Sequence, residues 1–356
     1  MTGRLHTNAA PQGRGPLISV VVVNYNGGDF LPGALASLQA QIFGDFEVIV
    51  VDNASTDGSL ALVRDWAAGR DNAQVVEAGG NIGFAAGANL GARQARGEWL
   101  AMLNPDAQAD PDWLSEIAAG IAAHPSTRCF ASTQLLAGSG REVVDGAGDC
   151  LAAYGFAWRA HAGQSPDALP GTARHVFTAC GASAAYHRET FRALGGFDER
   201  FFCYLEDVDL GYRMQRLGHD CVWLPRAVVR HADGGISASL PGFRQFHTAR
   251  NRVWVLWKNT PAILLVPSLA GWALMSALLG LKNALVRNGE VGPMLRGYRA
   301  GLAALPERRA RGKAPVTPWT TPLRMVSLWT LLRRMSWSPW AHRARAAKFR
   351  PIEDQR

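Results

Sequence analysis

Carboxylates that follow predicted strands or open a predicted helix are the groups best placed for chemistry in this chain. Asp52 ends an apolar run and begins a turn rich in Asn, Ser, Thr and Gly, whereas Asp106 closes the segment Asn104-Pro-Asp106. Glu206-Asp-Val-Asp209 opens a stretch with helical spacing. A carboxylate at such a point can accept a hydrogen bond from the N3–H of uracil or thymine, bind a hard divalent cation or take up a proton. Each also has a structural use, as a helix cap, a turn or a complement to the helix dipole.

The elements that must position these groups alternate between strands and helices. Apolar runs of strand length predict strands over residues 17–23, 46–51, 74–77 and 99–103. Helical spacing predicts helices over residues 30–39, 59–68 and 83–96. This alternation predicts an α/β fold with a doubly wound, Rossmann-like sheet, in which ligands lie beyond the carboxyl ends of the strands.

After residue 132 the pattern is less regular. Residues 133–149 and 151–161 are interpreted as irregular or antiparallel structure. A helix is predicted over residues 206–217 and a strand over 221–224, and helical spacing returns from Phe246 to Trp257.

Composition excludes several classes of protein. The chain has 356 residues, of which 48% are hydrophobic and 19% charged, so most of it is not disordered. Its five cysteines are odd in number and widely spaced, which argues against a disulfide scaffold and favours reduced thiols in a cytosolic compartment. The first apolar run is short and follows a polar leader, residues 1–16, so no secretory signal is expected.

The positive charge is concentrated at the C-terminal end. Residues 282–356 contain 16 Lys or Arg and four Asp or Glu, leaving 21 basic and 25 acidic residues elsewhere, and seven of the 12 Trp lie at or beyond Trp254. Residues 260–281 contain no charge and are long enough to span a bilayer. Pro261, Pro267, Gly271 and Gly280 lead us to favour helices lying in the membrane interface over one true span. A hydrophobic hairpin packed on the globular domain is the alternative.

Four segments in order carry a resemblance to a known family. They are Val23-Asn-Tyr-Asn-Gly27, Val51-Asp-Asn-Ala-Ser-Thr-Asp-Gly58, Leu103-Asn-Pro-Asp106 and Phe201-Phe-Cys-Tyr-Leu-Glu-Asp-Val-Asp-Leu210. Residues 17–258 resemble the inverting family 2 glycosyltransferases with the GT-A fold, especially their bacterial rhamnosyltransferase-like branch. The resemblance implies a GT-A domain over residues 17–258. From composition and charge, residues 1–16 are expected to be a flexible leader and residues 259–356 a basic, Trp-rich, helical, membrane-associating extension.

The resemblance implies a nucleotide site at the strand ends. Asp52 matches the carboxylate that binds the base, and Asn24 and Tyr25 would border that base. Asp57 is then left as the helix cap or a secondary contact. Gly83 would allow close approach of the ribose, unless it serves only as a turn.

Asn104, Pro105 and Asp106 occupy the place of the family's Asp-x-Asp motif, next to the nucleotide. Asp106 matches the carboxylate that holds a divalent metal, Mg²⁺ or Mn²⁺, whereas Asn104 stands where an Asp is usual and removes one charge. His231 matches a position that often supplies a further metal or diphosphate ligand. A structural hydrogen-bonding His is the alternative.

Asp207 matches the family's general base. Glu206 would orient the acceptor or Asp207, and Asp209 is expected to be structural. Gly181 resembles the acceptor-side segment, where a small residue leaves room for the sugar. Arg250 is expected either to contact a phosphate or to lie on a solvated helix face.

The leading hypothesis is an inverting glycosyltransferase that takes a sugar from a pyrimidine nucleotide, best dTDP-rhamnose, to a lipid-linked or polysaccharide acceptor in cell-surface glycan biosynthesis. It would act at the cytoplasmic face of a bacterial inner membrane, peripheral or with a single span, on an anionic surface and without nucleic acid. The alternatives are a UDP-sugar-dependent transferase of the same family and a non-catalytic, membrane-associated glycan-binding relative. A nucleotidyltransferase and a dinucleotide oxidoreductase are disfavoured, because residues 24–28 lack a basic residue and no GxGxxG follows the first strand.

Overall fold

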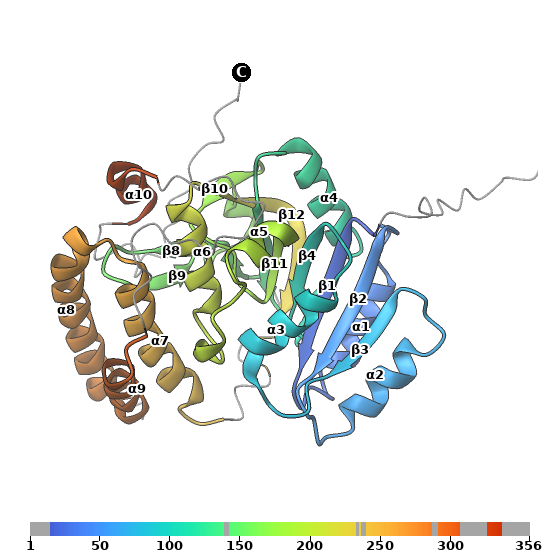
Figure 1. The fold of residues 1–356 in the computed structure, drawn as a ribbon, viewed down its shortest axis with the longest axis horizontal. Helices are drawn as coiled ribbons and strands as arrows, with labels where there is room; N and C mark the ends of the chain where they lie inside the picture. The colour runs from blue at the N-terminus through green and yellow to red at the C-terminus, as the bar shows by residue number, and fades with distance from the viewer. Residues whose placement is uncertain are drawn as a thin grey trace, which may run out of the picture.

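Apolar runs in the first third of the chain build the parallel half of one sheet. The computed structural model describes residues 15–138, 142–232, 235, 240–286, 291–306 and 326–336 (Figure 1). Its parallel strands are β1 (Ile18–Asn24), β2 (Phe46–Asp52), β3 (Ala73–Glu77) and β4 (Trp99–Leu103). The connections carry helices α1 (Leu31–Gln39), α2 (Ser59–Ala67) and α3 (Gly83–Gln94). The predicted α/β alternation is therefore confirmed, and the register places Asn24 beside Asp52.

The other half of the sheet is mixed. Its strand order is β10-β12-β6-β11-β4-β1-β2-β3, and β5 and β7 pair at the side. The strands concerned are β5 (Ala107–Ala109), β6 (Cys129–Leu136), β7 (Val144–Ala147), β10 (Arg174–Val176), β11 (Ser183–His187) and β12 (Cys221–His231). A separate hairpin pairs β8 (Asp149–Leu151) with β9 (Ala157–Arg159), and α4 (Trp113–Ala123) precedes β6. The antiparallel pairing of β7, β8 and β9 agrees with the expectation for residues 133–161.

The last sheet strand, β12, joins two short stretches of the sequence into one strand. The sequence pattern predicts a strand over residues 221–224 and strand-like residues over 227–230, with Pro225 and Arg226 between them. The structure continues through this interruption by a register shift between Leu224 and Val228. The continuation pairs His231 with Ala107 of β5 and so brings it next to Asp106.

A strained turn leads into helix α6 (Glu206–Arg216). Phe202, Tyr204 and Leu205 have φ values of 64°, 69° and 63°, a region that costs roughly 1–3 kcal/mol for each residue other than Gly. Asn251 of α7 (Phe243–Asn259) is fully buried and donates through Nδ2 to the carbonyls of Cys203 and Tyr204, at 2.9 and 2.7 Å. The turn therefore depends on α7. The remaining short helices of the sheet domain are η1 (Pro166–Ala168), α5 (Arg188–Ala193) and η2 (Glu199–Phe201).

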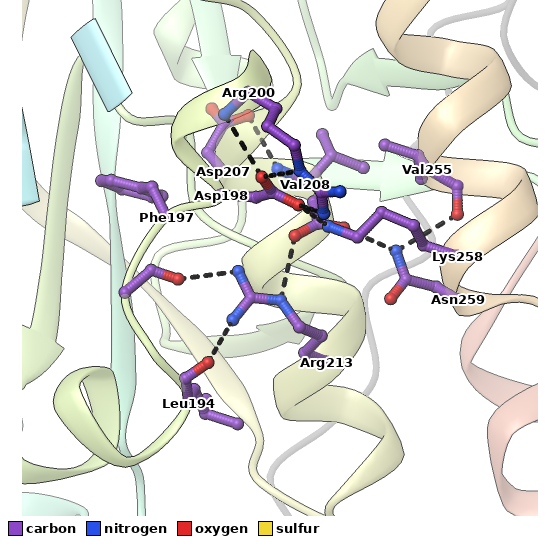
Figure 2. A network of polar contacts seen from close by, with 12 residues as sticks. Leu194, Phe197, Asp198, Arg200, Asp207, Val208, Arg213, Val255, Lys258 and Asn259 are labelled. Atoms are coloured by element: carbon purple, nitrogen blue, oxygen red, sulfur yellow. Dashed lines mark hydrogen bonds and ion pairs between the residues drawn. The ribbon is translucent and has the colours of Figure 1, made fainter. Parts of the chain in front are cut away.

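A buried ionic network joins α7 to α6. Figure 2 shows Lys258 and Asn259 of α7 extending toward Asp198 and the start of α6. Lys258 Nζ lies 2.8 Å from Asp209 Oδ1 and also contacts Asp198 Oδ2, while Arg213 Nε lies 2.9 Å from Asp209 Oδ2. Burial alone would raise the pKa of Asp209, but Arg213 and Lys258 hold that pKa below its usual value. The structural role expected for Asp209 is confirmed.

Three helices follow α7. They are α8 (Ala262–Val286), α9 (Val291–Ala303) and α10 (Leu328–Arg334), and α8 lies at the outer edge of the molecule beside α7 and α9 (Figure 1). Pro267 lies inside α8 without ending it, and Pro261 directly precedes the helix. The choice between helices in the membrane interface and one span stays a prediction. In the described part of the chain, one helix is both long enough and apolar enough to cross a membrane, and it covers Ala262–Leu285.

Helix α8 carries apolar side chains on its exposed side, where a surface helix of a water-soluble protein carries polar ones. Its exposed large side chains are apolar, namely Ile263, Val266, Leu274, Leu278, Leu281 and Leu285. Its buried polar side chains, Ser268, Ser276 and Asn283, instead face the rest of the protein. Lys282 is the charged residue on the exposed side, near the end of the helix. A surface of this kind is stable in contact with hydrocarbon rather than with water.

The ionic network predicts that Lys258→Met lowers the stability of the fold. Removing the cation leaves Asp198 and Asp209 buried without it, which should lower the free energy of unfolding by about 3–5 kcal/mol at pH 7. Both carboxylates have depressed pKa values in the folded state, so their ionic stabilisation is present at neutral pH and is lost as the pH falls below about 4. The difference between variant and wild type should therefore narrow on acidification, as measured by urea unfolding.

Arg64→Met is the matched control for this measurement. The Arg64–Glu77 pair on the surface is more than half exposed on both sides, so its loss should change the free energy of unfolding by less than about 1 kcal/mol. Equal losses in the two variants would contradict a stabilising role for the buried network.

Candidate active site

The predicted nucleotide-binding residues meet where β1 and β2 end. Asp52 Oδ1 accepts a hydrogen bond from Asn24 Nδ2 at 3.1 Å, and Asp52 Oδ2 accepts one from the Ser55 N–H at 3.0 Å. Asn24 and Asp52 are 0% and 1% exposed, whereas Tyr25 beside them is half-buried. Asp52 therefore fixes the turn that follows β2 in this structure, and base recognition by Asp52 stays a prediction.

Asp57 has the capping role that the sequence suggested. Its Oδ1 accepts from the N–H of Ser59, the first residue of α2, at 3.0 Å, and its Oδ2 accepts from the Gly28 N–H at 2.8 Å. Although burial acts in the opposite direction, the hydrogen bonds from Ser59 and Gly28 lower the pKa of Asp57. Asp57 thus ties the loop after β1 to the start of α2.

Gly83 is required by its local geometry. Its φ is +83°, and a Cβ added there would lie 2.5 Å from the Phe202 ring. The glycine therefore permits α3 to begin directly against the strained turn before α6. Its proposed contact with a ribose remains a prediction.

Asp106 and His231 form a second centre. Asp106 lies in the turn that follows β4. Asn104 holds this turn, because its N–H donates to the Ala182 carbonyl and its carbonyl accepts from the Ala107 N–H. His231 Nε2 lies 3.4 Å from Asp106 Oδ1, and His231 Nδ1 lies 3.1 Å from Asp145 Oδ2. Burial disfavours the charged imidazole, but the carboxylates of Asp106 and Asp145 raise the pKa of His231 to about 9.

This centre fits a hard divalent cation. Asp106 Oδ1 is buried and accepts no hydrogen bond from the described residues. An imidazole nitrogen of His231 faces Asp106 Oδ1. The other ring nitrogen contacts the Asp145 carboxylate, and a carboxylate in that position commonly orients a histidine that binds a metal. Gly235 lies so close that a Cβ there would be 1.7 Å from Asp106 Oδ2. Asp106 and His231 are therefore the residues that would hold a metal.

Asp207 is held at the first turn of α6. Its Oδ2 accepts from the Gly181 N–H and its Oδ1 from the Val208 N–H, both at 2.7 Å, and the residue is 8% exposed. Burial raises the pKa of Asp207, and these N–H donors oppose the rise only in part. A carboxylate with a raised pKa is a stronger proton acceptor, as a general base requires. Gly181, which was predicted to face the acceptor, thus contacts the predicted base.

Glu206 differs from its neighbour. It is 4% exposed, and its Oε2 accepts no hydrogen bond among the described residues. Burial and the adjacent charge of Asp207 raise the pKa of Glu206 well above its usual value. Glu206 is therefore more easily protonated than an exposed glutamate, and in its protonated form it can donate a hydrogen bond.

Cys203 shows that the two centres are neighbours. Burial raises the pKa of its thiol, and the charges of Glu206, Asp207 and Asp106 raise it further. The carboxylates of Asp106 and Asp207 therefore both act on the charge of this one thiol. All five cysteines are free, in agreement with the prediction of reduced thiols.

Arg250 supports the turn before α6. Its Nη2 donates to the Phe201 carbonyl at 2.7 Å and its Nε to Asn251 Oδ1 at 2.8 Å, while its guanidinium carbon lies 4.5 Å from the Trp254 ring centroid. Arg250 is therefore engaged within the protein rather than placed on a solvated helix face. Its proposed phosphate contact remains a prediction.

The sequence interpretation missed a group of four residues, Asp145, Asp149, Arg159 and Cys180. Arg159 forms an ion pair with Asp145, and its Nη2 lies 3.1 Å from Cys180 Sγ. Ligand atoms of Asp149, Cys180 and Asp207 all lie within 4.8 Å of one another. Burial and the charge of Asp207 raise the pKa of Asp149 to about 8. No motif marks these residues, because they come from segments that were interpreted only as irregular, antiparallel or apolar.

The Asp149–Cys180–Asp207 group offers three potential metal ligands, but it fits a cation less well than the Asp106–His231 centre. The guanidinium of Arg159 already places a positive charge beside Cys180. Burial raises the pKa of the Cys180 thiol to about 12, so the sulfur is protonated at neutral pH. We therefore interpret this group as a proton-sharing carboxylate pair.

The mixed sheet, whose parallel half presents a polar edge, has the fold of the GT-A glycosyltransferases. Glycosyl transferase family 2 is the family whose model matches residues 19–195, and the chain belongs to that family. It is 29% identical over 238 residues to the N-acetylglucosaminyl-diphospho-decaprenol L-rhamnosyltransferase of Mycobacterium tuberculosis, covering 60% of this chain and 76% of the relative.

Two solved structures share the fold. GalNAc-T7 with UDP, GalNAc and Mn²⁺ gives a TM-score of 0.57 at 18% identity; the match covers 69% of this chain and 48%, about half, of that one. The mannosyltransferase PcManGT of Pyrobaculum calidifontis, in complex with GDP-Man and Mn²⁺, gives 0.53 at 20% identity, covering 83% of this chain and 90% of that one. At these identities the likeness establishes the fold alone.

Replacing the predicted base should lower the rate of sugar transfer and leave nucleotide binding nearly unchanged. We expect Asp207→Asn to lower nucleoside diphosphate release from the donor sugar by roughly 10²–10⁴-fold, because the amide cannot accept the acceptor proton. Nucleotide binding should change little. Asp65→Asn on the exposed face of α2 is the control and should keep normal turnover. Wild-type turnover in a folded Asp207→Asn variant would contradict the assignment.

Proposed function

We propose that the protein is an inverting glycosyltransferase that transfers rhamnose from dTDP-rhamnose to a lipid-linked or polysaccharide acceptor in cell-surface glycan biosynthesis. The observation that carries this proposal is the position of Asp207, a buried carboxylate with a raised pKa beside the Asp106–His231 centre. The rhamnosyltransferase from Mycobacterium tuberculosis, whose name includes a decaprenol-linked acceptor, supports the choice of donor and acceptor class.

The transfer is one in-line displacement at the anomeric carbon. The acceptor oxygen forms a bond to that carbon while the bond to the diphosphate oxygen breaks with its electron pair. Asp207 takes the acceptor hydroxyl proton from the face opposite the leaving group. Glu206, protonated and adjacent, donates a hydrogen bond that orients the acceptor or Asp207.

The diphosphate must leave with its developing charge compensated. Asp106 and His231 would hold a divalent cation, Mg²⁺ or Mn²⁺, which supplies that compensation when bound. Both solved structures that share the fold contain Mn²⁺, which makes it the first cation to test. Asn104 contributes no charge, so Asp106 and His231 carry most of this task.

The nucleotide is proposed to be a pyrimidine because Asp52 follows β2 in the place where a carboxylate can accept the N3–H of the base. Uracil and thymine present the same N3–H, so a UDP-sugar donor is the alternative within the same mechanism. A non-catalytic glycan-binding relative is the alternative from another class. It requires no role for the buried carboxylate at α6.

The membrane is the proposed second partner. Helix α8 exposes an apolar face along its whole length and turns its buried polar side chains toward the protein. At 25 residues it is about 37 Å long, comparable to a bilayer. We propose that residues 259–356 attach the domain to the cytoplasmic face of an inner membrane, with α8 in the interface and a single span as the alternative.

Nucleotide binding provides the first test of the donor. With Mn²⁺ present, dTDP or UDP at about 100 times its Kd should raise the melting temperature by roughly 5–10 °C. GDP and ADP should give little shift, and Asp106→Ala should remove the metal dependence. If no nucleotide stabilised the wild-type protein, with or without metal, the non-catalytic alternative would be favoured.

Charge on the exposed face of α8 provides the test of membrane attachment. The double variant Leu274→Glu and Leu278→Glu should move most of the protein from the floating fraction to the soluble fraction in flotation with anionic vesicles, since burying a carboxylate in hydrocarbon is costly. Ala61→Glu on the exposed face of α2 is the control and should float like wild type. Unchanged flotation of the double variant would exclude α8 as the anchor.

A further inference from the structure

Arg159 lies between the two halves of the proposed active site. It ends β9 and forms an ion pair with Asp145, whose carboxylate also contacts His231 Nδ1. On the other side, its Nη2 lies 3.1 Å from Cys180 Sγ, in the group that includes Asp149 and Asp207. One guanidinium therefore connects the centre that would hold the cation to the centre that would take the proton.

The surroundings of Asp207 are mostly acidic. The titratable groups whose charges interact with that of Asp207 are Asp149 of β8, Cys180 before β11, Tyr186 of β11, Glu206 of α6, Cys203 of the preceding turn and Arg159 of β9. Each acidic member that ionises disfavours a negative charge on Asp207. Among the side chains described around Asp207, Arg159 supplies the positive charge that favours it.

Asp149 and Asp207 cannot both carry a charge without cost, because their carboxylate oxygens lie within 4.8 Å and both residues are buried. Asp207 accepts two backbone N–H bonds, whereas Asp149 Oδ1 accepts none among the described residues. The negative charge of the pair therefore resides on Asp207 and the proton on Asp149. A carboxylate pair with such a division of roles is a common way to set a general base.

We propose that Arg159 is a positioning residue for the general base, holding Asp207 in its ionised form and fixing Asp145 behind His231. This inference rests on the proposed function, since it assumes that Asp207 accepts the proton of the acceptor. No contact between Arg159 and substrate is required. Its effect is exerted through Asp207 and Asp145.

The positive charge of Arg159 decides in which direction its loss moves the pH dependence of kcat/KM. Without the guanidinium, Asp207 is harder to ionise, so a larger fraction is protonated at a given pH and cannot act as a base. The acid limb of the pH dependence of kcat/KM should therefore move to higher pH. A merely structural contribution would lower kcat/KM by the same factor at every pH.

The test compares Arg159→Gln with Arg159→Lys over pH 5–9.5. In Arg159→Gln the midpoint of the acid limb should rise by at least about one pH unit, which lowers kcat/KM about tenfold on that limb, with recovery toward pH 9. Arg159→Lys, which keeps the charge, should retain most of the wild-type midpoint. Arg226→Gln, an exposed arginine paired with Glu116, is the matched control and should not change the profile.

A pH-independent loss in folded Arg159→Gln, with an unchanged midpoint, would overturn the proposal. If Arg159→Gln does not fold, Arg159→Lys still decides: a midpoint displaced by a full pH unit despite the retained charge would also overturn it.

A second measurement does not depend on turnover. Because Arg159 also favours the thiolate of Cys180, alkylation of Cys180 by iodoacetamide at pH 9.5, followed by peptide mass spectrometry, should be at least about fivefold slower in Arg159→Gln than in wild type. If no donor gives turnover, the proposed function fails while this labelling still tests the charge effect. Equal labelling rates in the two proteins would show that Arg159 does not control this group and would overturn the proposal.

Discussion

The burial of three carboxylates in the first turn of α6 is the constraint on which the rest of the site depends. Glu206, Asp207 and Asp209 are all less than 10% exposed, and ionised carboxylates are not stable in such surroundings without partners. Each of the three carboxylates has different partners. Asp209 receives two cations and an amide, Asp207 receives backbone N–H groups, and burial raises the pKa of Glu206. One short sequence thus holds a structural anion, the proposed base and a carboxyl group that favours its protonated form.

Helix α7 makes this arrangement possible. Asn251 and Arg250 hold the carbonyls of the strained turn before α6, and Lys258 and Asn259 reach Asp209 from the end of the same helix. The chain then continues directly into α8, whose apolar face is exposed. The element that supports the proposed base is therefore covalently continuous with the proposed membrane anchor. In this architecture the proposed lipid-linked acceptor and the proposed base on α6 would share one support.

The two centres of the site are joined by Asp145 of β7, at the side of the main sheet, and Arg159 of β9, in the separate hairpin. Asp145 and Arg159 lie between His231 on one side and Cys180 and Asp207 on the other. This path is polar and largely shielded from solvent, so its members restrict one another through both charge and geometry. A substitution at one centre is therefore expected to alter the charge or the geometry of the other.

The sequence by itself determined the order of strands and helices in the parallel half of the sheet. It also identified the polar strand ends at Asp52 and Asp106 and the acidic start of α6, because hydrophobic periodicity and strand-end chemistry are local properties. Asp57 as a cap, Asp209 as a structural residue and the five free thiols were equally accessible from local context and composition.

The tertiary structure alone decided the rest. Asp145, Asp149, Arg159 and Cys180 acquire their meaning only because folding places them around Asp207 and His231, and no local pattern encodes a contact between residues so far apart in the chain. The register shift that carries β12 past Pro225 to His231, and the side of α8 that remains exposed, were likewise set by packing. The ionisation of a buried carboxylate depends on every charge and dipole around it, and those neighbours are fixed only when the chain has folded.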